Sequence, residues 1–178
     1  MYPTVLNLSQ PFRRVGDMSS DNPIGADNQQ ETERRIRIDP WWLVGFVDGE
    51  GCFSVSIHRN TLARPTNGWH LQPSFQISQH HSHREVLRAI RQFFGTGSVR
   101  SKGPNSAVDV SVIHSTKELE RTVIPFFENH PLHVKQDDFL AFARITRAVR
   151  RREHHRPEVF DELVRLAYSM NANGKQRK

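Results

Sequence analysis

The chain has 178 residues, a net charge of +6 at neutral pH and a pI near 10.1. This length is sufficient for one domain with its own hydrophobic core. The single cysteine, Cys52, excludes an internal disulfide and a cysteine-rich zinc site. No apolar run approaches the roughly 20 residues that span a bilayer, so we expect no membrane partner. The excess of basic residues favours a polyanionic binding partner, of which nucleic acid is the commonest.

The chain opens with a segment that has no hydrophobic periodicity. Residues 1–38 therefore indicate a flexible N-terminal tail, and the domain itself is expected over 39–175. Asp39 is a favourable N-cap and Pro40 is favoured at the first helical position. These two residues predict a helix that runs to about Gly49.

Alternating apolar and polar residues then predict strands over 52–59 and near 70–79. Ser82 is expected to cap a helix over 83–94. The remaining predicted elements, in chain order, are a strand around Val99, a strand over 108–112, a helix over 116–128 that opens with a capping box from Ser115 to Glu118, and helices over 136–152 and 157–170. This order predicts an α+β fold with a short sheet whose helices cover one face.

The strands predict two chemically different sheet faces. Their apolar residues, including Val108, Val110 and Val112, form the expected buried face. The other face carries polar residues with hydrogen-bonding heads and no acid, which are Ser54, Ser56, His58, Gln72, Gln76, Ser98, Arg100 and Lys102. Such a face suits phosphates and base edges. The alternative interpretation is an ordinary solvated sheet face.

Two glycines and two acids mark the end of the first helix. Gly45 and Gly49 are four residues apart and share a helical face, where small residues allow two backbones to approach closely. Trp41 lies roughly on that face. Asp48 and Glu50 are two apart and do not face each other. Glu50 sits where the helix dipole disfavours negative charge, which a bound divalent cation would compensate.

The stretch Leu43-Val44-Gly45-Phe46-Val47-Asp48-Gly49-Glu50-Gly51 and the strand after it resemble the signature helix and first strand of LAGLIDADG homing endonucleases. Residues 75–79 are similar to the family's second strand, residues 131–139 to its segment with an active-site lysine, and residues 170–175 to a frequent family ending. Val44 and Glu50 depart from the commoner alanine and aspartate. The implied fold is αββαββα, with a four-stranded antiparallel saddle sheet and extra C-terminal helices.

The motif occurs once, so the resemblance implies a homodimer in which each chain supplies half of the active site. The implied dimer interface consists of Trp41, Gly45, Asp48 and Gly49. Glu50 and the backbone carbonyl of Gly49 would hold Mg²⁺ or Mn²⁺, and the implied catalytic residues are Glu50, Gln79 and Lys135. Asp48 is interpreted as structural, holding either the helix end or the dimer seam.

The implied function is site-specific hydrolysis of double-stranded DNA. The expected DNA-binding residues are Ser54, Ser56, His58, Arg59, Arg64, His70, Gln72, Gln76, Ser98, Arg100 and Lys102. Two alternatives remain open: a maturase that assists splicing of intron RNA, and a catalytically inactive DNA-binding regulator. The resemblance suggests an organelle, with bacterial cytoplasm as the alternative location. Arg150-Arg151-Arg152 is interpreted either as a phosphate contact or as a solvated helix end.

Overall fold

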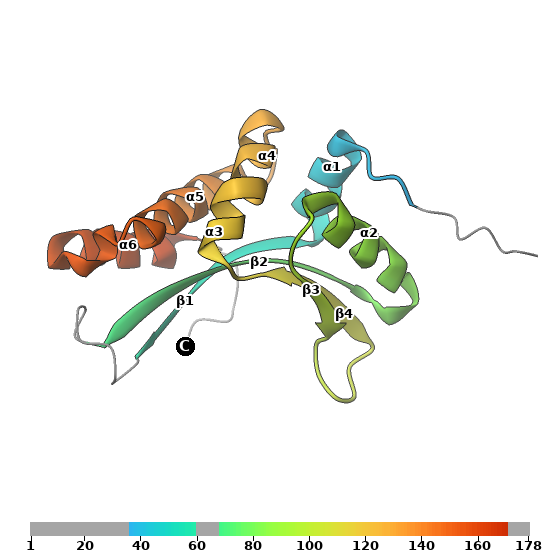
Figure 1. Cartoon of the computed structure of the whole chain (residues 1–178), viewed down its shortest axis with the longest axis horizontal. Helices are drawn as coiled ribbons and strands as arrows, with labels where there is room; N and C mark the ends of the chain where they lie inside the picture. The colour runs from blue at the N-terminus through green and yellow to red at the C-terminus, as the bar shows by residue number, and fades with distance from the viewer. Residues whose placement is uncertain (1–35, 60–67, 171–178) are drawn as a thin grey trace, which may run out of the picture. The chain divides into compact units, whose positions relative to one another are not determined.

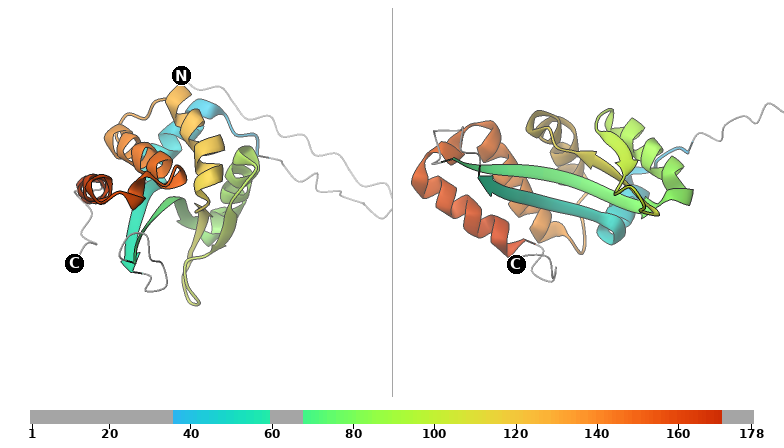
Figure 2. Two further views of the ribbon diagram at one scale, coloured as in Figure 1. Left: turned by 60° about the vertical axis from the view of Figure 1, so that its left-hand side comes forward. Right: turned by 90° about the horizontal axis from the view of Figure 1, so that it is seen from below.

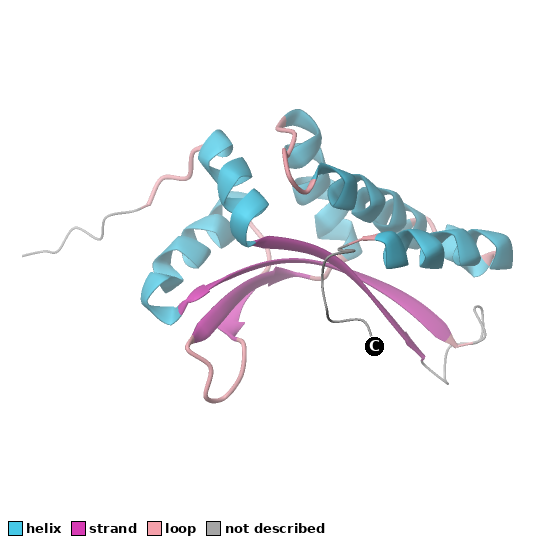
Figure 3. Cartoon of the chain, turned by 180° about the vertical axis from the view of Figure 1, so that it is seen from behind, coloured by secondary structure: helices cyan, strands magenta, loops and turns pink. Residues whose placement is uncertain are grey.

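A curved four-stranded antiparallel sheet carries the helices on one side and leaves its concave side without a helix (Figure 1). Figure 3 views the molecule from behind and shows the helices on the same side of the sheet. This computed structural model describes residues 36–59 and 68–170, which belong to one compact unit over residues 35–178. The tail predicted over 1–38 lies mostly outside the described residues, as do Arg64 and the ending at 171–175.

The order of elements agrees with the predicted α+β fold. In chain order they are α1 (Pro40–Glu50), β1 (Gly51–Arg59), β2 (Trp69–His80), the 3₁₀ turn η1 (His81–His83), α2 (Arg84–Phe94), β3 (Ser98–Ser101), β4 (Val108–Ile113), α3 (Thr116–Glu118), the π-helical turn η2 (Leu119–Val123), α4 (Ile124–Asn129), α5 (Gln136–Arg150), the 3₁₀ turn η3 (Glu153–His155) and α6 (Pro157–Ser169). The sheet order is β1-β2-β4-β3. Within the described ranges, no helix is long and apolar enough to cross a membrane.

Local sequence accounts for the start of α1 and for the long β1–β2 pairing. The carboxylate of Asp39 accepts the amides of Trp41 and Trp42, both at 2.9 Å. The ladder then runs without interruption from Gly51 opposite Ile77 to the outer end of the hairpin. α1 therefore leads directly into the inner end of β1.

The hydrophobic core lies between the sheet and the helices and is centred on Phe53 of β1. The Phe53 ring centroid lies 5.5 Å from that of Phe127, 5.5 Å from that of Phe139 and 5.3 Å from that of Phe142. All four rings are fully buried, and each such side chain contributes about 1.5–3 kcal/mol. This packing fixes α4 and α5 against β1.

The prediction for the faces of β4 was wrong. The register pairs Val112 with Gln76 and Ser98, and Val110 with Ser78 and Arg100. The valines therefore share the open face with those polar residues. Asp109, Ser111 and Ile113 face the helices, where the buried Asp109 carboxylate lies 3.2 Å from Arg84 of α2. The alternation of side chains along β4 was predicted correctly. The ion pair with Arg84 of α2 determines which of its two faces points towards the helices.

The expected cap at Ser82 was also wrong. Ser82 lies inside η1, and the imidazole of His80 accepts its amide at 3.3 Å. α2 begins at Arg84, and its N-cap His83 makes no side-chain cap bond. The capping box at Ser115 is confirmed, since the hydroxyl of Ser115 accepts the amide of Glu118 at 3.4 Å.

Candidate active site and nucleic-acid interface

The end of α1 is joined to the start of α5 by the carboxylate of Asp48. Its two oxygens accept the backbone amides of His133 at 2.8 Å, Val134 at 3.1 Å and Lys135 at 3.0 Å. A carboxylate that accepts several amides at once makes strong, charge-assisted hydrogen bonds. These three hydrogen bonds from the half-buried Asp48 hold the end of α1 to the segment before α5. A further role of Asp48 at a dimer seam stays a prediction.

Lys135 makes the reciprocal contact from the α5 side. Its ammonium donates to the backbone carbonyl oxygens of Val47 at 3.1 Å and Gly49 at 3.2 Å, and also to that of Asp48. The last carbonyls of a helix lack partners within the helix, and a cation there also interacts favourably with the helix dipole. Lys135 thus caps α1 and stands at the point where Glu50 leaves the helix.

Glu50 is the last residue of α1 and is exposed. Within the described ranges its carboxylate has no hydrogen-bonding or ionic partner. A negative charge at a helix C-terminus is mildly unfavourable. The carboxylate is therefore available to a ligand from outside the chain.

The glycine after Glu50 is required by close packing rather than by an unusual backbone conformation. Gly51 has ordinary extended backbone angles, φ −79° and ψ 157°. A Cβ at Gly51 would lie 2.6 Å from a Val47 methyl carbon and 2.7 Å from its carbonyl oxygen. Gly51 is therefore needed for close approach of helix and strand. At Gly45 and Gly49, a Cβ would meet nothing within 4 Å, so this face of α1 is open.

Gln79 lies near the same helix end through the register of β2. Gly51, the first residue of β1, pairs with Ile77, and β2 continues two residues further to Gln79. Gln79 therefore extends past the start of β1 on the side where α1 ends. It pairs with Asp109 of β4 and is half-buried. The fold thus brings Glu50, Gln79 and Lys135 to one end of the sheet.

Positive charges also gather around Cys52, the residue two after Glu50. Burial raises the pKa of the Cys52 thiol, and Asp138 adds to this rise, whereas Lys135, Lys102 and a hydrogen bond with Ser54 lower it.

The described residues of one chain offer too few side-chain ligands for a complete metal site. The described part of the chain contains no group of three His, Cys, Asp or Glu side chains that could hold a metal ion. The Gly49 carbonyl that was predicted as a metal ligand already accepts the Lys135 ammonium. A carbonyl oxygen has two lone pairs and can accept twice. Together with the Glu50 carboxylate it provides oxygen donors of the kind that divalent cations prefer.

The open face of the sheet contains most of the predicted polar residues and several more. The prediction was wrong for Arg59, which pairs with Trp69 and has the parity of the helix-facing residues. Lys102 lies just beyond the end of β3, where its amide donates to the carbonyl oxygen of Val108 at 2.9 Å. By register the members of the open face are Cys52, Ser54, Ser56, His58, His70, Gln72, Ser74, Gln76, Ser78, His80, Ser98, Arg100, Val108, Val110 and Val112. None of these is an acid, and Arg100 is exposed. Cys52, Ser74, Ser78 and His80 were not predicted, although alternation along β1 and β2 gives them the same parity. Viewed from below, no helix crosses these strands, and α6 runs beside β1 (Figure 2).

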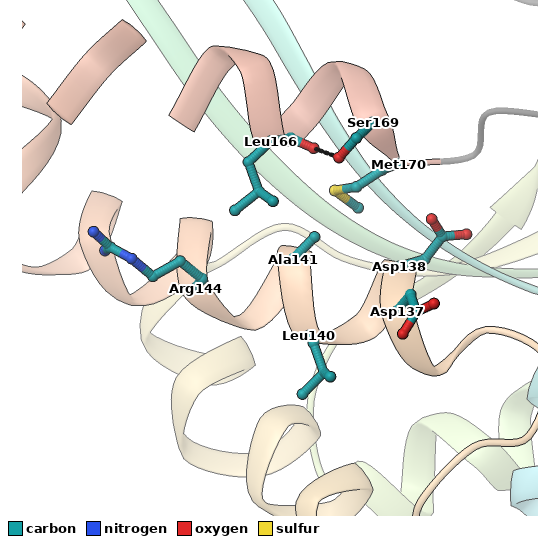
Figure 4. A pocket seen from close by; sticks show the side chains of 8 residues that line it. All are labelled: Asp137, Asp138, Leu140, Ala141, Arg144, Leu166, Ser169 and Met170. Atoms are coloured by element: carbon teal, nitrogen blue, oxygen red, sulfur yellow. Dashed lines mark hydrogen bonds between the residues drawn. The ribbon is translucent and has the colours of Figure 1, made fainter. Parts of the chain in front are cut away.

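Acids gather instead along α5 and α6. Figure 4 shows a hollow between these helices, with Asp137 and Asp138 at one end and Arg144 at the other. Its apolar lining includes Leu140 and Leu166. The hollow contains none of the predicted catalytic residues. The acids of α5 and α6 therefore lie on the helix-bearing side of the sheet, whereas the strand residues of the open face include none.

The fold and the site define a LAGLIDADG-type endonuclease domain. The chain belongs to this family, because the model of the LAGLIDADG endonuclease family matches residues 43–146. A protein of Neurospora crassa named "Probable intron-encoded endonuclease 3" is 32% identical over 138 residues, 76% of this chain and 25% of that protein. The homing endonuclease I-ApeII of Aeropyrum pernix is 28% identical over 139 residues, which cover 77% of this chain and 81% of I-ApeII.

Solved structures share the fold. The crystal structure of the homing endonuclease I-TnaI superposes with a TM-score of 0.72 and 38% identity, covering 80% of this chain and 94% of that one. I-SmaMI bound to an uncleaved DNA target in the presence of calcium ions gives a TM-score of 0.72 and 28% identity, covering 79% of this chain and 47% of that one. This chain therefore spans about half of I-SmaMI, and it matches 25% of the length of the Neurospora relative.

Proposed function

We propose that the protein is a homodimeric, site-specific endonuclease that hydrolyses phosphodiester bonds of double-stranded DNA with a divalent metal ion. One observation carries the proposal: among the residues that the structure describes, a sheet face without acids and without a covering helix leads at its inner end to the Glu50 carboxylate, which has no partner there. The face provides donors for phosphates and base edges. Glu50 lies beside it rather than within it, so the acid does not repel the bound duplex along its length.

The catalytic assignments follow from the joint between α1 and α5. Two Glu50 carboxylates, one from each subunit, would hold Mg²⁺ or Mn²⁺, which favour oxygen ligands. The ion supplies charge stabilisation at the phosphate and a more acidic water. Lys135 fixes the end of α1 through three carbonyls, and its charge stands close enough to the helix end to favour a phosphate there. Gln79 offers an amide that can orient water.

The homodimer rests on the exposed face of α1. Trp41 is 60% exposed and Trp42 is 44% exposed, and the space over Gly45 and Gly49 is open. Two large apolar side chains beside an open glycine face are costly to leave in water and suit close packing with an identical helix. A two-fold axis through this face would bring the two Glu50 residues together.

An organelle is the proposed location. Among the relatives, a protein of Podospora anserina is named for intron 1 of ND4, and a Schizosaccharomyces pombe protein is named intron-encoded endonuclease Cox1-I1b. We extend that intron-encoded character to this chain as part of the proposal. The natural substrate would then be the junction sequence that lacks the intron.

The test compares cleavage and binding on a duplex that spans the intronless junction of the host gene. Wild-type protein should cut both strands in magnesium and bind without cutting in calcium. Glu50→Gln should bind as tightly or more tightly, because repulsion from phosphates is relieved, and should cut neither strand. Glu158→Gln, an exposed acid of α6, is the matched control and should cut normally.

Each other result has a clear meaning. Full cleavage by Glu50→Gln would overturn the metal-ligand assignment. Specific DNA binding without cleavage by the wild-type protein would support the regulator. Preference for the intron RNA over the DNA junction would support the maturase.

A further inference from the structure

The α5–α6 connector, defined as residues 151–156, is strongly basic and lies outside the proposed active site. It reads Arg151-Arg152-Glu153-His154-His155-Arg156. Its one acid is neutralised within the protein, because the Glu153 carboxylate lies 3.0 Å from Arg144 and 3.9 Å from Arg151. The connector therefore presents uncompensated positive charge.

Arg152 and Arg156 carry that charge. Both are exposed, and neither has an acid within ion-pair distance in the described part of the chain. Arg150, by contrast, lies 3.9 Å from Glu120. The earlier alternative of a solvated helix end fits Arg150 and Arg151, which close α5 and have acidic neighbours. It does not account for the two arginines that follow.

Local structure favours other residues at both positions. Arg152 has φ 62°, the one positive φ of a non-glycine residue within the described ranges, and that region favours glycine. Arg156 is the N-cap of α6 and makes no side-chain cap bond. An N-cap favours Ser, Thr, Asp or Asn, and the helix dipole disfavours a cation there. An arginine at each of these positions lowers stability relative to a residue that suits the backbone or caps the helix. Such a residue choice indicates that the two side chains have a function.

The connector lies at the outer end of the sheet, away from α1. Figures 1 and 2 show the α5–α6 turn at the same end of the sheet as the outer ends of β1 and β2. His154 is buried, and burial lowers its pKa, with further lowering by His155 and by His70 of β2. His70 pairs with His58 on the open face. The buried His154 therefore holds the connector against α5 and α6 at this end of the sheet.

We propose that the α5–α6 connector is a second phosphate-binding element, in which Arg152 and Arg156 bind the backbone of the duplex beyond the outer end of the sheet. This inference rests on the proposed function and lengthens the site contacted by each subunit. Guanidinium groups bind phosphate oxygens in a bidentate manner. Phosphate contacts set affinity and orientation without reading sequence, which suits a flank that no strand reaches.

The test replaces both arginines by residues that fit the local backbone better than arginine does. Arg152→Gly removes the charge and suits the left-handed backbone, and Arg156→Ser removes the charge and supplies a cap. The double variant should unfold at the same or a higher temperature, yet bind the junction duplex more weakly. For the dimer, its slope of log K against log salt should be less steep by about 3.6, since two arginines are lost from each subunit and each phosphate contact contributes about 0.9. Hydroxyl-radical footprints should shorten at both outer ends.

Arg165→Gln on α6 is the control for net charge, and it removes one positive charge per subunit where the double variant removes two. It is exposed, lies among the acids of α6, and should leave the salt slope and the footprint unchanged. An unchanged slope and footprint in the double variant would overturn the connector's role. A change about half as large in Arg165→Gln, which removes half as much charge, would also overturn it, since net charge alone would then explain the effect. Failure of wild-type protein to bind any duplex would instead overturn the proposed function.

Discussion

Asp48 and Lys135 each bind the backbone of the other. The Asp48 carboxylate accepts the Lys135 amide at 3.0 Å, and the Lys135 ammonium donates to the Asp48 carbonyl oxygen. The two residues are 87 positions apart in the chain. Their contacts lock the end of α1 to the start of α5, and they do so within one or two residues of Glu50.

Asp48→Asn should lower stability, because one neutral carbonyl oxygen replaces two charged acceptors for three amides. We expect a loss of about 1–3 kcal/mol in the free energy of unfolding, measured by urea denaturation. Asp161→Asn, an exposed acid of α6, should change it by less than about 0.5 kcal/mol. Equal losses in both variants would show that the amide contacts of Asp48 contribute nothing.

Lys135→Met should also destabilise the protein, because the carbonyls at the end of α1 lose their donor. In a double-mutant cycle with Asp48→Asn, the two losses should not add. We expect a coupling energy of about 0.5–3 kcal/mol, as found for residues in one network. Strict additivity would mean that the two contacts support the joint independently.

Gly45→Leu should separate folding from dimerisation. A side chain at Gly45 meets nothing within 4 Å in the single chain, and removing a helical glycine adds up to about 1 kcal/mol of stability. The variant should therefore stay folded while a partner helix is pushed away. Light scattering should report a folded monomer, and cleavage should be lost. A Gly45→Leu dimer would contradict the proposed interface.

Arg100→Ala should weaken DNA binding, because Arg100 is an exposed cation of the open face. If it contacts one phosphate in each subunit, the salt slope of the dimer should become less steep by about 1.8, which is about 0.9 for each contact. If it reads guanine, specificity at one base pair should relax by about 1–3 kcal/mol. Lys117→Ala on α3 is the control and should alter neither quantity. Binding that is indifferent to salt would contradict the role of this face.

Because the pKa of the buried His154 is lowered, we expect the protein to lose stability in mild acid. This pKa is lowered from the ordinary 6.5, first by burial and then by His155 and His70. The unfolded chain therefore takes up the proton first, so stability is full above about pH 6.5 and falls as the pH drops towards the lower folded pKa. In His154→Phe, the difference in unfolding free energy between roughly pH 7.5 and 5.5 should shrink. An unchanged difference would assign the acid sensitivity elsewhere.

Residues close together in the chain were enough to predict much of the fold. Asp39 and Pro40 set the start of α1 through a cap that involves neighbouring amides. The alternation in β1 placed Ser54 and Ser56 on one face, because successive strand side chains point to opposite sides. The helix end at Glu50 was likewise readable from the signature motif.

Tertiary structure alone decided which contacts those elements make. The open face of β4 depends on the Asp109–Arg84 pair across the core, and alternation cannot tell the two faces of a strand apart. Likewise, the sequence resemblance predicted a catalytic Lys135 but not its hold on the α1 carbonyls. That hold exists only because packing around Phe53 brings α5 against the end of α1, and no local pattern encodes a contact across 87 residues.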